Sequence, residues 1–204
     1  MAPRALPRLA CFVAILSGFS GCGTNMPGTS GGPFGAPAES RLLSPFAGAW
    51  AFDFDKTLAA QKAAGAPDEQ VEKLRKLYSE NPLLGKMHQD IKIRGNEAVG
   101  SGMPAVEYRF FAMHEHDGKV CGKAWHHEDR FDPGDMSKCY VRLVLKGNEL
   151  SFEMRMQEGL PDLNDPDLRS LPPADAGSAA ECDADNPPGK DWSEWTTFVF
   201  TRKQ

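Results

Sequence analysis

The sequence predicts a mainly β protein: an eight-stranded antiparallel up-and-down barrel with a short helical insert after the first strand. Three observations support this fold class. Segments of alternating apolar and polar residues recur through residues 46–204, as they do in half-buried strands. Short turn sequences separate most of these segments. Eight antiparallel strands can close into a cylinder, and closure removes the exposed edges that an open sheet would leave.

The first predicted strand covers residues 50–54, where Trp, Ala, Phe, Asp and Phe alternate in polarity. A pair of helices is expected after it, over 58–64 and 67–79. Thr57 is a suitable N-cap for the first helix, since a hydroxyl can accept a hydrogen bond from the first turn. Pro67 suits the first position of the second helix. The insert therefore interrupts the order of strands directly after the first one.

Seven further strands follow, and most are joined by tight turns. They are predicted over 87–94, 97–102, 106–115, 119–131, 139–146, 149–156 and 195–202. Asp117-Gly118 between two alternating runs is a strong hairpin signal. A two-residue turn there fixes three expected pairs: His116 with Lys119, Phe110 with Trp125, and Tyr108 with His127. Residues 157–191 lack periodicity and are predicted to form a long acidic loop.

Two short motifs stand at the ends of the predicted barrel, Gly48-Ala49-Trp50 and Phe200-Thr201-Arg202. They resemble the terminal motifs of the lipocalin-like, or calycin, families, which have Gly-x-Trp on the first strand and an arginine that packs across that tryptophan. The resemblance implies that Trp50 and Arg202 close the barrel. A guanidinium over an indole contributes about 0.5–2 kcal/mol as it is desolvated.

The start of the chain has the composition of a secretory signal over residues 1–21: a basic beginning, a short apolar run and small residues before a cleavage site. Phe19-Ser20-Gly21-Cys22 resembles the bacterial lipobox. This resemblance implies cleavage before Cys22 and addition of a diacylglyceryl group to its sulfur. The alternative is an ordinary signal peptide that leaves Cys22 unmodified.

Three regions follow from this interpretation: the signal peptide, a tether over 22–45 and the barrel domain over 46–204. The tether is rich in Gly, Pro, Ser and Thr, so it is expected to be disordered. Lipidation predicts attachment to a membrane of the bacterial cell envelope, with the domain outside the cytoplasm. Gly23 after the cysteine favours the outer membrane in a diderm organism.

Charge and cysteine content narrow the functional classes. Without Arg4 and Arg8 of the signal, 21 basic and 28 acidic residues remain, a net charge of −7. Such a domain lacks the basic surface that nucleic-acid binding needs. Cys121, Cys139 and Cys182 remain after the tether, and an oxidising envelope allows two of them to pair. Three pairings are open.

The inward-facing residues form the candidate site. The expected register places a row of aromatic, aliphatic and methionine side chains on one face: Tyr108, Phe110, Trp125, Val141, Leu143, Phe152 and Met154. These residues either pack as a plain core or line an apolar cavity. An eight-stranded barrel has room for packed side chains or for one small ligand. A small apolar ligand is therefore one expected partner.

The sequence gives only weak evidence for a metal site or a catalytic site. Two histidine pairs, at 114 and 116 and at 126 and 127, are too far apart in the expected register to share a metal ion, so no metal or other cofactor is predicted. His114 falls opposite Cys121, but this pair lacks the orienting group of a catalytic site. We therefore predict a non-enzymatic binding module, with a structural or interaction protein of filled core as the alternative. The sequence names neither ligand nor protein partner.

Overall fold

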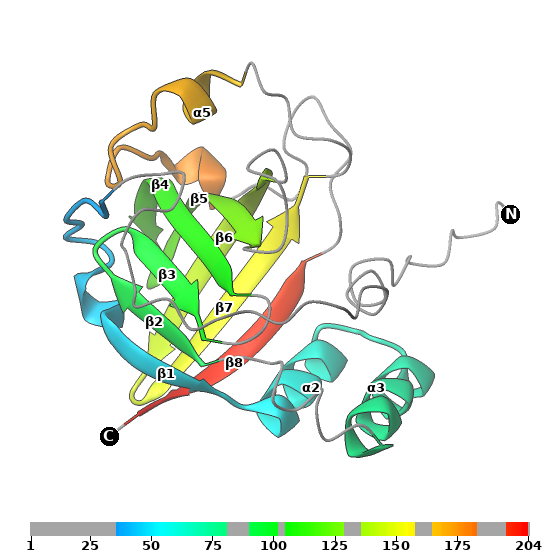
Figure 1. Cartoon of the computed structure of the whole chain (residues 1–204). Helices are drawn as coiled ribbons and strands as arrows, with labels where there is room; N and C mark the ends of the chain where they lie inside the picture. Colours follow the sequence, from blue (N-terminus) through cyan, green and yellow to red (C-terminus); the bar gives the residue numbers. More distant parts are fainter. Residues whose placement is uncertain are drawn as a thin grey trace, which may run out of the picture. The chain divides into compact units, whose positions relative to one another are not determined.

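The computed structural model shows a closed barrel of eight antiparallel strands joined in sequence order (Figure 1). It describes residues 36–80, 90–101, 105–128, 136–157, 165–182 and 195–203. The strands are β1 (Gly48–Phe52), β2 (Ile91–Arg94), β3 (Glu97–Gly100), β4 (Val106–His116), β5 (Lys119–Glu128), β6 (Met136–Lys146), β7 (Glu149–Met156) and β8 (Thr196–Arg202). The predicted number, order and direction of strands are confirmed. The signal peptide and Cys22 lie outside the described residues.

The barrel closes between the first and last strands. Trp50 is the register partner of Arg202, and Phe52 is the partner of Phe200. The Arg202 guanidinium lies 4.4 Å from the centre of the Trp50 ring. Burial of the indole and the stack of the cation on it both favour the closed form over an open sheet.

Two helices follow β1 directly, α2 (Phe54–Ala63) and α3 (Asp68–Glu80). The first begins four residues earlier than its Thr57 cap would allow, because the Asp53 carboxylate accepts a hydrogen bond from the Lys56 amide (3.1 Å). Thr57 instead packs on the outer face of β8, where its hydroxyl accepts a hydrogen bond from the Val199 amide (2.9 Å). The predicted cap is therefore wrong, and Thr57 fixes the helix to the barrel.

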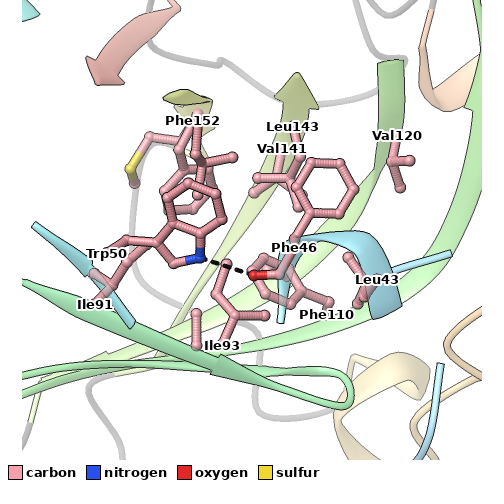
Figure 2. Packing of buried hydrophobic residues seen from close by; sticks show 14 of the residues in the cluster. Leu43, Phe46, Trp50, Ile91, Ile93, Phe110, Val120, Val141, Leu143 and Phe152 are labelled. Atoms are coloured by element: carbon pink, nitrogen blue, oxygen red, sulfur yellow. Dashed lines mark hydrogen bonds between the residues drawn. The ribbon is translucent and has the colours of Figure 1, made fainter. Parts of the chain in front are cut away.

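One end of the barrel is filled by the segment before β1 (Figure 2). Leu43 and Phe46, at the 3-10 helix η2 (Ser44–Phe46), are 1% and 4% exposed and belong to the barrel core. The Trp50 indole N–H donates to the Phe46 carbonyl (2.8 Å). We call this end of the barrel the closed end. Residues 40–46, which fill it, are called the seat.

The ordered start of the domain differs from the expected tether. Composition predicts disorder for residues 36–45, yet Ser40 is buried and donates a hydrogen bond to Asp175. The Ala38 amide donates to the Asn96 side chain (2.7 Å). The compact unit of the barrel therefore includes residues from Ala36 onward, because two apolar anchors further on, Leu43 and Phe46, hold this polar segment against the barrel.

A β-bulge in β4 shifts the register of the β4–β5 hairpin. The turn pairs His116 with Lys119 as predicted, but the register slips between Phe111 and His114. Ala112 adopts a φ of 50°, and its amide donates to the Pro173 carbonyl instead of to β5 (3.3 Å). Because β4 has one extra residue at the bulge, every β4–β5 pair on the side away from the turn is shifted by one position. Phe110 consequently pairs with Ala124, Arg109 with Trp125, and Tyr108 with His126.

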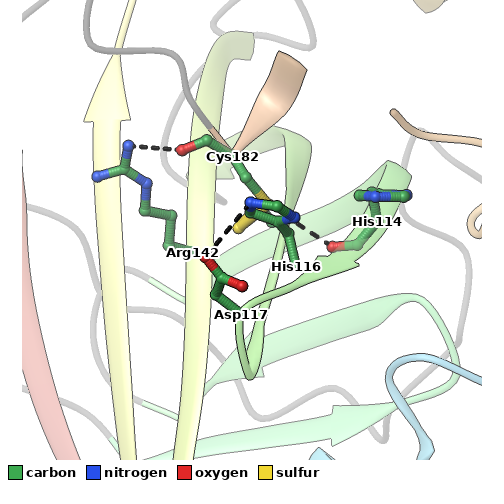
Figure 3. Close-up of a disulfide and its surroundings, with 6 residues drawn as sticks. His114, His116, Asp117, Arg142 and Cys182 are labelled. Atoms are coloured by element: carbon green, nitrogen blue, oxygen red, sulfur yellow. Dashed lines mark hydrogen bonds and ion pairs between the residues drawn. A yellow bond between two sulfur atoms is a disulfide. The ribbon is translucent and has the colours of Figure 1, made fainter. Parts of the chain in front are cut away.

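The described part of the predicted acidic loop packs on the outside of the barrel. It contains α5 (Pro166–Arg169) and the 3-10 helix η3 (Ala179–Glu181). A disulfide joins Cys182 to Cys121 of β5, and the Arg142 guanidinium donates to the Cys182 carbonyl (2.8 Å; Figure 3). Of the three open pairings, the structure has Cys121 with Cys182. Cys139 is a free, buried thiol inside the barrel.

Candidate functional site

The end of the barrel opposite η2 carries half-buried apolar side chains on its inner wall. We call this the open end and define it by residues that are partly buried and face inward: Phe52, Tyr108, His126, Met156 and Phe198. The Phe52 and Phe198 rings lie 6.5 Å apart, and the Tyr108 and His126 rings lie 5.1 Å apart. The open end therefore offers partly accessible aromatic surface drawn from several strands.

Below the open end, side chains from opposite walls meet across the barrel. The Tyr108 ring on β4 lies 5.1 Å from the Phe152 ring on β7, although β5 and β6 separate these strands. The Tyr108 hydroxyl donates to the Met154 sulfur (3.7 Å). Phe110 also reaches Phe152, at 6.2 Å. The barrel is thus bridged by its own side chains at this level.

Between this bridge and η2, the core is tightly enclosed. Four large side chains have no exposed surface: Phe110, Val141, Leu143 and Leu150. Figure 2 shows the Phe46 ring pointing inward among the labelled core residues. Accessible apolar surface of the lumen is therefore concentrated at the open end, so a deep ligand site would require Tyr108 to move.

Six of the seven predicted lining residues lie inside the barrel. They are Tyr108, Phe110, Val141, Leu143, Phe152 and Met154. Trp125 does not, because the bulge turns it to the outer face. There its ring lies 6.3 Å from the Phe111 ring and 5.5 Å from the Lys138 ammonium group. The assignment of Trp125 to the interior is therefore wrong.

Lys138 links Trp125 to the loop that covers it. Its ammonium group contacts the carboxylates of Asp165 (3.0 Å) and Asp167, and its side chain is only 13% exposed. The outer face of β4 to β6 is thus a buried layer beneath residues 165–182. Trp125 therefore packs in that layer, on the outside of the barrel, and does not line the lumen.

His126 is the inward residue that sequence reasoning missed. The expected register placed His127 opposite Tyr108, whereas the structure places His126 there. Burial lowers the pKa of His126 from 6.5 to about 4, with a smaller contribution from the nearby His127. The imidazole is therefore neutral at pH 7. Ala112 carries no turn or bulge signal in the sequence, so the register shift that reveals His126 could not be anticipated.

The lowered pKa of His126 predicts a loss of stability in acid. The unfolded chain has the ordinary pKa near 6.5 and binds a proton that the folded chain excludes, so stability is full above about pH 6.5 and falls as the pH approaches 4. The complete effect is at most about 3 kcal/mol for a shift of this size. Urea unfolding from pH 7.5 to 4 measures it, and His126→Gln should lack this component. Parallel curves for both proteins would contradict the burial of a neutral imidazole.

A second hollow lies outside the barrel, between α2 and the β4–β5 and β6–β7 turns. It has a volume of about 750 Å³. Its floor is mainly apolar and its rim is charged, with lining residues that include Lys56, Ala59, Ala60, Lys119, Val144, Lys146, Glu149, Glu153 and Val199. Lys56 and Glu149 form an ion pair across it (2.6 Å). This surface hollow lies beside the β4–β5 and β6–β7 turns, at the end of the strands away from the open end, and provides a control position for experiments on the open end.

No family model, curated protein or solved structure matches this chain. The geometry of its own residues therefore carries the functional argument. Within the described ranges, no helix is both long and apolar enough to cross a bilayer.

The structure also bears on the two other kinds of site, catalytic and metal-binding, for which the sequence offers residues. Cys121 does lie opposite His114, but its sulfur is bonded to Cys182, so the oxidised protein has no thiol at that position. Figure 3 shows His114 and His116 around this disulfide. Among the described residues, no three His, Cys, Asp or Glu side chains are grouped as metal ligands.

Proposed function

We propose that this protein is a lipid-anchored protein of the bacterial envelope whose lipocalin-like barrel binds a small apolar ligand at its open end. The lipobox-like segment before Cys22 supports the anchor. The stack of Arg202 on Trp50 supports the lipocalin-like assignment, because the family motifs carry the same two residue types in these places.

The observation that carries the ligand proposal is the half-burial of Phe52, Tyr108, Met156 and Phe198 at one end of the lumen. Most other described apolar side chains of the inner wall are buried, and Leu145 near the β6–β7 turn is an exception. Half-exposed aromatic and methionine side chains in a concave wall are typical of sites for small apolar molecules, and methionine adapts its shape to different ligands.

Native mass spectrometry of the full-length protein, extracted from its own membrane, tests both parts. We expect a chain that starts at Cys22, carries acyl groups and retains a small non-covalent molecule. Phe198→Asp should lose that molecule, because it places a charge in the open end. Val144→Asp, in the surface hollow, should keep it. A bare chain would contradict the anchor. An acylated chain with no bound molecule would contradict the ligand proposal, and loss only in Val144→Asp would move the site to the hollow.

One observation favours a second candidate, a structural or interaction protein with a filled core. The contact between Tyr108 and Phe152 spans the lumen, and it already buries apolar surface that a ligand would otherwise cover. In this case the barrel would be a rigid support for contacts made by its outer surface. The retained molecule in the mass spectrum separates the two candidates.

A further inference from the structure

We infer that the outer face of β1 to β3 rests on the membrane to which the protein is anchored and contacts anionic lipid headgroups there. This inference rests on the lipid anchor of the proposed function. It adds which side of the domain meets the membrane and which class of lipid that side contacts. The residues that point outward on these three strands support it.

The outward residues of β1 to β3 follow from the register of the strands. Trp50, Ile91 and Ile93 belong to the barrel core, so the residues that alternate with them face outward. We call this surface the β1–β3 face, and its exposed members are Ala49, Lys92, Arg94 and Val99. Val99 is the one large hydrophobic residue that is exposed in the described ranges. The face therefore combines small and apolar side chains with two cations.

The two cations of the β1–β3 face are available to bind anions. Among the described residues, none forms a hydrogen bond or an ion pair with the side chain of Lys92 or Arg94. The nearby carboxylate of Asp90 already forms an ion pair with Lys203 across the outside of β1. Phosphate groups of lipid headgroups could therefore approach Lys92 and Arg94 without displacing a protein partner.

Two further acids border the β1–β3 face, and both are matched to an arginine. Glu97 and Glu107 contact the Arg109 guanidinium at 2.7 and 3.1 Å. Their side chains are only 20% and 17% exposed, so the single negative charge that this group has in excess is largely buried. It does not offset the two exposed cations beside it.

The adjoining parts of the chain that lie outside the described ranges carry no acid. Residues 81–89, before β2, contain one lysine, one histidine and neither Asp nor Glu. Residues 102–104, between β3 and β4, are uncharged, and so are residues 22–35. The positive charge of the β1–β3 face is therefore not cancelled by its neighbours in the sequence, although acids outnumber bases in the whole chain, 28 to 23.

The chain that leads to the anchor joins the domain beside this face. The Ala36 carbonyl accepts a hydrogen bond from Arg109 (3.2 Å). Ala38 exchanges two hydrogen bonds with Asn96, in the turn between β2 and β3. The segment from Cys22 to residue 35 is 14 residues long, and a flexible chain of that length has a root-mean-square span of about 20 Å. An anchor held this close brings the β1–β3 face to the membrane, where each cation near an anionic surface favours contact about fivefold.

Lys92 and Lys146 are matched reporters for a test. Both are exposed lysines without a described partner, and β2 and β6 stand four strands apart in either direction around the barrel, so the two side chains lie on opposite sides. The full-length mature protein is incorporated into phosphatidylcholine vesicles with or without phosphatidylglycerol, and lysines are acetylated with membrane-impermeant sulfo-NHS acetate. We expect phosphatidylglycerol to slow the acetylation of Lys92 at least roughly threefold and to leave Lys146 unchanged. NaCl at about 0.5 M, where the Debye length is about 4 Å, should remove the difference.

The outcomes separate this inference from the proposed function. If phosphatidylglycerol has the same effect on Lys92 and Lys146 in vesicle-bound protein, the inference is overturned and the anchor stands. Protection of Lys146 alone would place the opposite side on the membrane and would also overturn it. A protein that floats with neither kind of vesicle would contradict the anchor itself.

Val99→Cys provides a second reporter on the same face, since the free cysteine described inside the barrel is buried. A membrane-impermeant maleimide should label this thiol slowly in vesicles with phosphatidylglycerol. Adding Lys92→Gln and Arg94→Gln should restore fast labelling, whereas the matched pair Lys119→Gln and Lys146→Gln should leave the thiol protected. Circular dichroism checks that each variant is folded. Equal restoration by both pairs would show that net charge alone matters and would overturn the assignment to the β1–β3 face.

Discussion

Trp50→Ala is expected to lower the free energy of unfolding by about 4 kcal/mol, the usual range for removal of a fully buried tryptophan. Trp50 has no exposed surface and belongs to the core at the closed end. Its loss removes the hydrogen bond to the Phe46 carbonyl and the surface on which Arg202 stacks. Urea unfolding followed by circular dichroism measures the change.

Trp195 offers a matched control for this substitution. Its ring is half-buried and contacts the Arg142 guanidinium at 3.9 Å on the outside of the barrel. Trp195→Ala should therefore cost less than half as much as Trp50→Ala. If both substitutions had equal effects, the closed end would not hold the barrel together as its contacts indicate.

Removal of the disulfide by the double change Cys121→Ala and Cys182→Ala is expected to cost about 4 kcal/mol. The bond closes a loop with a sequence separation of 61 residues, and a cross-link of this span strongly restricts the unfolded chain. Chemical denaturation gives the free energy. A reducing agent should lower the stability of the wild-type protein and leave the double variant unchanged.

Cys139→Ala is the control for the loss of a sulfur atom. Cys139 is buried and unpaired, so its replacement leaves a small cavity and should cost about 1 kcal/mol. It should also leave the sensitivity to reducing agent intact. A wild-type protein that resists denaturation equally with and without reductant would show that the bond between Cys121 and Cys182 contributes little to stability.

The order of strands could be predicted because each strand carries its own local pattern. Alternation with a period of two and short polar turns are visible residue by residue, and together they require few long-range assumptions. The closing contact between Trp50 and Arg202 followed from the resemblance of two motifs. These features depend on residues near one another in the sequence or on a pairing expected from the families that the two motifs resemble.

The remaining features depend on long-range contacts. The bulge at Ala112 is stabilised by Pro173, Ala174 and Gly177, which are about sixty residues further along the chain. The inward position of His126 and the outward position of Trp125 are consequences of that bulge. Similarly, the order of residues 36–45 depends on Asn96 and Asp175. Composition alone suggested a flexible segment because these partners are not adjacent in the sequence.

The seat formed by residues 40–46 also determines how the domain would respond to mechanical load. A pull on the chain from its amino-terminal side reaches the hydrogen bonds between Ala38 and Asn96 first, then Ser40 and its Asp175 partner, and then the buried side chains of Leu43 and Phe46. Only after these contacts give way does tension act on β1 and its ladders to β2 and β8. Under such a load, the contacts of residues 38–46 would break before the ladders of β1 carry any tension.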